Sequence, residues 1–89
     1  MRTIWKFPLK LTDEQDVLIP SGPRFLTVQM QGSIPTLWAS VDTEGIPTSY
    51  HILCRGTGHP LNGKEAIYLG TVQERQFVWH FFEGEVPDA

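Results

Sequence analysis

Apolar and polar residues alternate over short stretches along most of the chain, a pattern typical of β-strands that turn one face toward a core. The two clearest stretches are residues 25–31 and 36–42, and the pair between them, Gly32 and Ser33, suits a tight turn. We therefore predict a β-hairpin over these residues. Its inward-facing side chains are predicted to be Leu26, Val28, Met30, Leu37, Ala39 and Val41.

Strand signals recur in five further segments, at residues 3–9, 16–19, 49–55, 66–72 and 76–83. Seven prolines and eight glycines separate the segments and leave no window of helical length. The one helical candidate, residues 11–18 with Thr12 as a cap, makes only about two turns and is too short to be stable without tertiary packing. We predict an all-β fold, a small sandwich or partly closed barrel of about seven antiparallel strands with little or no helix.

The first segment carries a tryptophan and a lysine on opposite faces. Trp5 shares its side of the strand with Phe7 and Leu9, whereas Lys6 points the other way. We expect Trp5 to pack in the core. Trp38 alternates with core residues and is expected to be the more exposed ring.

The last strand is apolar on both faces, because Phe77, Trp79 and Phe81 alternate with Val78 and Phe82 (residues 77–82). Such a strand is either a central strand covered on both sides, or one with a face that contacts another copy of the chain. Because so short a chain has few strands to spare as cover, we predict a homo-oligomer, with His80 in or near the interface.

The composition is that of one small globular domain, with 89 residues, 40% hydrophobic and 19% charged. We place this domain at residues 1–83 and expect residues 84–89 to be a flexible acidic tail. A formal net charge of −3 argues against a partner such as a DNA or RNA duplex. The single cysteine, Cys54, excludes an internal disulfide and suits a reducing cytosol, and no apolar run has the roughly 18 residues of a membrane span. We therefore expect an intracellular protein that binds no membrane.

Motifs for catalysis and metal binding are missing from the sequence. It contains no Gly-x-Ser-x-Gly elbow, no Gly-x4-Gly-Lys-Ser/Thr loop and no closely spaced pair of histidines that could hold zinc. His51 and Cys54 fall on opposite faces of one strand because their separation is odd, so they form no dyad. We predict a protein that is not an enzyme and uses no metal or cofactor. Acid–base catalysis by His51, His59 or His80 is a further hypothesis, which ranks third after the two binding functions described below.

The most specific local feature is the loop that runs through Arg55, Gly56, Thr57, Gly58 and His59. Two glycines that flank a threonine can expose successive backbone amides as a concave nest for an anion. A guanidinium before the nest and an imidazole after it could bind a phosphate or a carboxylate together with the amides. The alternative is a bulge or a strand-joining turn that binds nothing.

Four sequence blocks span nearly the whole chain: IWKFP at residues 4–8, GTGHP at 56–60, YLGTV at 68–72 and FVWHFFE at 77–83. In these blocks the chain resembles a family of small uncharacterised proteins of tailed bacteriophages and prophages. The resemblance implies a phage origin and a location in the cytoplasm of the infected bacterial host. It assigns no catalytic residue.

Two functions are expected for a phage protein of this kind. The first is an anti-defence sponge, which sequesters a nucleotide signalling molecule of antiviral immunity in a pocket of the oligomer. An aromatic ring would stack on the base while cations and amides hold the phosphate, and Trp5 and Lys6 would serve if the first strand meets the 55–59 loop. The alternative is a protein that binds and inhibits a host defence protein through an exposed β edge or aromatic patch.

Overall fold

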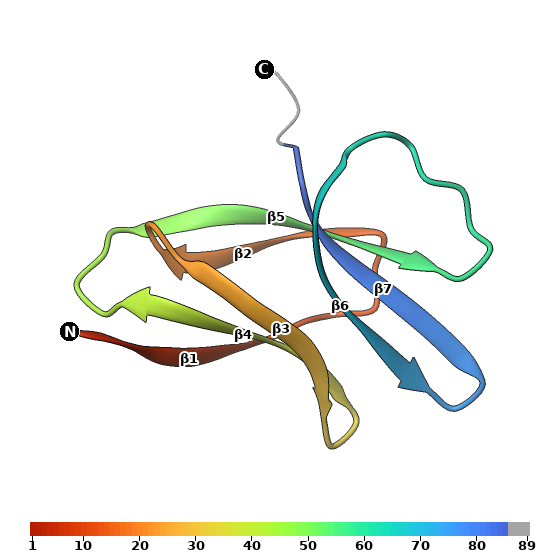
Figure 1. Ribbon diagram of the computed structural model, residues 1–89, viewed down its shortest axis with the longest axis horizontal. Coiled ribbons are helices and arrows are strands. Elements are labelled where there is room, and N and C mark those ends of the chain that lie inside the picture. Colours follow the sequence, from red (N-terminus) through yellow and green to blue (C-terminus); the bar gives the residue numbers. More distant parts are fainter. Residues whose placement is uncertain (86–89) are drawn as a thin grey trace.

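The structure, a computed structural model, describes residues 1–85, which form seven antiparallel strands in two sheets (Figure 1). The strands are β1 (Arg2–Pro8), β2 (Glu14–Pro20), β3 (Arg24–Gln31), β4 (Ile34–Asp42), β5 (Pro47–Gly56), β6 (Glu65–Glu74) and β7 (Phe77–Gly84). One sheet has the order β1-β4-β3 and the other β2-β5-β7-β6, and they are not closed into a barrel. The predicted all-β fold is confirmed. No helix in residues 1–85 is long and apolar enough to cross a membrane.

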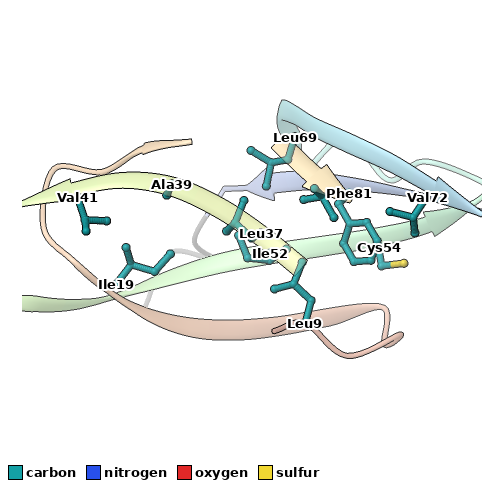
Figure 2. Close-up of a cluster of buried hydrophobic side chains, with 11 residues drawn as sticks. Leu9, Ile19, Leu37, Ala39, Val41, Ile52, Cys54, Leu69, Val72 and Phe81 are labelled. Atoms are coloured by element: carbon teal, nitrogen blue, oxygen red, sulfur yellow. The ribbon is translucent and has the colours of Figure 1, made fainter. Parts of the chain in front are cut away.

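The core lies between the two sheets, and Figure 2 shows its apolar side chains converging from both. Phe81 of β7 and Leu37 of β4 are fully buried at 0% exposure, so the central strands of the two sheets supply the middle of the core. The other members are Leu9, Ile19, Val28, Ala39, Val41, Ile52, Cys54, Leu69 and Val72. Burial of this apolar surface is the main source of stability.

The predicted hairpin forms, but one inward-facing residue was predicted wrongly. The register of β3 against β4 shifts between Phe25 and Thr27, which marks a β-bulge. The extra residue inverts the alternation, so Leu26 is 46% exposed while Phe25 packs against the core. Phe25 meets Tyr50 edge to face, with ring centroids 5.8 Å apart.

Strand β1 is an edge strand, and this limits the burial of its tryptophan. Trp5 pairs with the core residue Ala39 and so lies on the inner side of the sheet, as expected. Its ring is nevertheless 42% exposed, because no neighbouring strand covers that side of β1 within its sheet. Trp38, expected to be the more exposed ring, is half-buried. The Lys6 ammonium spans β4 and donates to Gln31 Oε1 at 2.9 Å.

Strand β7 is central, with β5 on one side and β6 on the other. Its inner face enters the core through Phe81, while Val78, His80 and Phe82 on the outer face are only half-buried. β7 continues to Gly84, and the Glu85 amide donates to the Lys64 carbonyl at 3.0 Å. The expected acidic tail therefore begins inside the fold, and its residues 86–89 lie outside the described part.

The two sheets come closest where β6 passes β3. A Cβ on Gly70 would lie 2.7 Å from the backbone nitrogen and oxygen of Val28, closer than atoms tolerate. Gly70 thus permits a backbone-to-backbone approach that any side chain would prevent. This contact holds the β6–β7 hairpin beside the β3–β4 hairpin, and the candidate site lies between their turns.

Candidate binding site

The loop after β5 begins with a tight turn and not with an anion nest. The His59 amide donates to the Gly56 carbonyl at 3.0 Å, and Gly58 has a φ of +88°. These are the features of a type II turn, in which glycine takes the position of positive φ. The Thr57 amide donates to the Val78 carbonyl at 3.1 Å. Two of the amides expected to face an anion are therefore already used, and the structure differs here from the predicted nest.

Gly56 is required for the position of the His59 ring. A Cβ on Gly56 would lie 2.8 Å from Cε1 and Nδ1 of His59 and 3.1 Å from the Trp79 ring. Because glycine leaves this space free, the imidazole folds back over the strand end. It then meets Trp79 edge to face, with centroids 6.3 Å apart and planes at 67°.

An open pocket of about 280 Å³ lies beside these rings. Phe77 stacks on Trp79 with centroids 5.9 Å apart and planes at 26°. Phe77 is 50% exposed, so much of its ring remains available for contact. The buried indole Nε1 of Trp79 has no hydrogen-bond partner within residues 1–85. The residues that line the pocket are Gly56, Thr57, His59, Gln76, Phe77, Val78 and Trp79.

A second pocket, of about 530 Å³, lies on the other side of Phe77, between the turns of the two hairpins. Figure 1 shows these turns, β3 to β4 and β6 to β7, at the same end of the molecule. The lining residues are Met30, Gly32, Ser33, Gln73, Glu74, Arg75 and Phe77. Phe77 belongs to both pockets, so we name the combined surface the Phe77 site.

Arg55 does not face the Phe77 site. Its Nε donates to Glu65 Oε2 at 2.9 Å, and its NH1 donates to the carbonyls of Asp13 and Cys54. The side chains of Arg55 and Glu65 are only 10% and 5% exposed. Arg55 thus ties β5 to the start of β2 and to β6, and its charge is neutralised inside the protein.

The Glu65 carboxylate also organises the loop that precedes it. It accepts hydrogen bonds from the amides of Asn62 and Gly63 at 3.2 and 3.1 Å. Desolvation alone would raise the pKa of Glu65, but hydrogen bonds from backbone amides and from Arg55 outweigh it and hold the pKa below its ordinary value. The ionised carboxylate is therefore a structural element of the loop.

Arg55 and His59 do line one common pocket, of about 340 Å³, but they share it with two acids, Asp13 and Glu14. With Arg55 already paired to Glu65, this pocket has little positive charge to offer an anion. The predicted convergence of guanidinium and imidazole is present, while the expected electrostatics are not.

Trp5 and Lys6 lie on β1, in the other sheet from the 55–59 loop. Neither residue lines any of the three pockets. The structure does not bring them to the loop, and the aromatic rings that line a pocket with the loop are those of Phe77 and Trp79. The sequence could have pointed to Phe77 and Trp79 through their position at the start of β7, just after a turn. Inward-facing rings at that position extend past the end of the core.

Two histidines on the outer face of the second sheet are fully engaged. His80 Nε2 lies 2.7 Å from Thr57 Oγ1 and Nδ1 lies 3.0 Å from Thr71 Oγ1. His51 Nδ1 lies 2.9 Å from Asp16 and Nε2 lies 2.6 Å from Glu14. The hydrogen bonds to Asp16 and then Glu14 raise the pKa of His51 above its ordinary value.

The acids around His51 bind opposite ring nitrogens, so their oxygens cannot converge on one ion. Within residues 1–85, no group of three His, Cys, Asp or Glu side chains could hold a metal. Cys54 is buried, and desolvation raises its pKa to about 11, so the thiol is protonated at neutral pH.

Comparison with known protein families matches all of residues 1–89 to a single description, Domain of unknown function (DUF7352). The chain belongs to the DUF7352 family. No curated protein and no solved structure matches it. For this DUF7352 protein, the geometry of the Phe77 site is therefore the feature that points to a function.

Proposed function

We propose that this protein is a non-enzymatic binding protein that sequesters a nucleotide-derived signalling molecule, with the base held at the Phe77 site. The observation that carries the proposal is the Phe77 ring, which is 50% exposed, stacked on Trp79 and bordered by a pocket on each side. A flat base can stack on such a ring, and each stacked base contributes about 1–3 kcal/mol.

The chemistry of the smaller pocket suits a neutral ring. Its lining contains no Asp, Glu, Lys or Arg, and three of its residues are the rings of His59, Phe77 and Trp79. Phe77 stacks on Trp79, and Trp79 packs against the hydrophobic core, so the stacking surface is ordered before binding. Preorganisation of this kind reduces the entropy lost on binding.

The resemblance to phage proteins makes the nucleotide signals of antiviral immunity the class to test first. In this proposal the protein acts in the host cytoplasm and releases its ligand intact. Self-association remains part of the proposal: the outer face of β7, with Tyr68 of β6 59% exposed against Phe82, is the surface through which a second copy would pack. Sedimentation equilibrium that reports only monomer would remove that part.

Calorimetric titration and thermal shift with cyclic dinucleotides, cyclic trinucleotides and ADP-ribose test the proposal. Phe77→Ala should weaken binding roughly tenfold or more, because it removes the stacking surface. Trp5→Ala is the matched control, since Trp5 is an exposed ring, 42% against 50% for Phe77, that lines none of the three pockets. It should leave the affinity unchanged.

If none of these compounds gives heat or a thermal shift at ~100 μM, the weak end of small-molecule binding, the sponge is wrong. The second candidate, a protein that inhibits a host defence protein, would then stand. It is favoured by the same exposed Phe77 beside an uncharged pocket, which an apolar side chain of a partner could fill. In that case Phe77→Ala should abolish the capture of one defined host protein, and Trp5→Ala should not.

A further inference from the structure

The two hairpin turns at the Phe77 site share a backbone requirement but meet it with different residues. Gly32 opens the β3–β4 turn with a φ of +61°, and Arg75 opens the β6–β7 turn with a φ of +57°. Glycine adopts this conformation without strain, whereas an arginine there is strained. Arg75 is the only residue other than glycine with positive φ in the described part of the chain.

The Arg75 side chain makes no hydrogen bond or ion pair inside the described part of the protein that would offset this strain. Arg55 and Arg2 each donate hydrogen bonds to other residues, whereas Arg75, like Arg24, makes no hydrogen bond or ion pair with any residue of 1–85. It is exposed and lines the larger pocket of the Phe77 site. A residue in a strained backbone conformation, without a polar partner and at the wall of a pocket, points to a role in binding.

We propose that Arg75 forms an anion subsite, which binds the phosphate of the nucleotide whose base stacks on Phe77. This inference rests on the proposed function and adds the charge recognition that Arg55 does not provide. Arg75 stands two residues before Phe77 at the same pocket, and Ser33 of the opposite turn lines that pocket too. Arginine binds phosphate with two parallel N–H donors, and a serine hydroxyl can add a third.

Glu74 lines the same pocket and is the one acid there. Its carboxylate repels an anion, so the subsite suits a single phosphate group better than a dense cluster of negative charges. Removal of this charge should therefore strengthen binding of a phosphate, which gives the proposal a gain-of-affinity test beside the loss-of-affinity test.

The experiment compares adenosine with adenosine 5′-monophosphate as probes, titrated into the full chain by calorimetry. The unmodified protein should bind the monophosphate roughly tenfold more tightly than the nucleoside, the scale of a lost charge-assisted hydrogen bond. Arg75→Gly should bind both probes equally, and Glu74→Gln should increase the affinity for the monophosphate alone. Arg75→Gly should also unfold at a higher urea concentration, which shows that its loss of affinity is not a loss of fold.

The outcomes separate this inference from the proposed function. If adenosine binds and the monophosphate binds no better, or if Arg75→Gly keeps the preference, the subsite is wrong while the base pocket stands. If only the monophosphate binds, and only with Arg75 present, the subsite stands without the base pocket. If neither adenosine nor the monophosphate binds, the base pocket and the anion subsite are both overturned as nucleotide sites.

Discussion

Gly56→Ala tests the contact that shapes the Phe77 site. The new Cβ would lie 2.8 Å from the His59 ring and 3.1 Å from the Trp79 ring. His59 is exposed and can swing into solvent, so the cost should be near the low end for overpacking, about 1 kcal/mol. The pocket would then lose its imidazole wall, and ligand binding should weaken with it.

A double-mutant cycle with His59→Ala isolates this clash. When the imidazole is absent, only the 3.1 Å approach to Trp79 remains among the nearest contacts, and Gly56→Ala should become almost neutral. The gain from restricting the unfolded chain, about 0.4–1 kcal/mol for Gly→Ala at an unstrained site, is the same in both backgrounds and cancels. We expect a coupling of about 1 kcal/mol between the two sites.

Urea denaturation followed by tryptophan fluorescence measures the four free energies of unfolding. Gly58→Ala is the matched control: it has open space around it but a φ of +88°, so it should destabilise through backbone strain without coupling to His59. Additive effects of Gly56→Ala and His59→Ala, within about 0.3–0.5 kcal/mol, would refute the assigned contact.

Three further predictions concern the scaffold. The pKa of His51 is higher in the folded protein than its value of about 6.5 in the unfolded chain, so protonated His51 stabilises the fold. This contribution is complete below pH 6.5 and is lost as the pH rises through the folded pKa. The urea midpoint should therefore fall over that range, and His51→Gln should make the fall smaller. Gly70→Ala should cost about 3 kcal/mol or more in urea denaturation, because the new Cβ meets backbone that cannot move, and a loss below 1 kcal/mol would contradict the close approach of the sheets. Arg55→Ala should lower the melting temperature more than Lys6→Ala does, because it leaves the 5%-exposed Glu65 carboxylate without its cation, and equal shifts would show that the tie is not structural.

The pattern of strands could be predicted from the sequence, because alternation and turn residues act locally. Leu37, Ala39 and Val41 face inward as predicted, and Gly32 turns the chain as predicted. The prediction that Leu26 faces inward was wrong because a β-bulge shifts the register of the strand by one residue. The alternation of apolar and polar residues alone does not reveal such a bulge.

The candidate site was harder to predict, because it depends on which turns meet in space. Gly56 and His59 were selected from their loop motif and do line a pocket, although through ring packing and not through an amide nest. Arg55 was also selected, but nothing local in the sequence shows that Glu65 neutralises it. Arg75 falls between the predicted strands at 66–72 and 76–83 and was not selected, since its positive φ and its place beside the opposite hairpin follow from the fold.

The most direct test of the Phe77 site is a two-dimensional ¹H–¹⁵N NMR titration of the full chain with adenosine 5′-monophosphate. The chain has three tryptophans, Trp5, Trp38 and Trp79, so three indole signals report on three places in the fold. We predict that the Trp79 indole and the backbone amides of Phe77 and His59 shift together and saturate, while the Trp5 indole stays in place. Saturating shifts at Trp5 and Lys6 with none at Trp79, or no shifts at all, would contradict a binding site at Phe77.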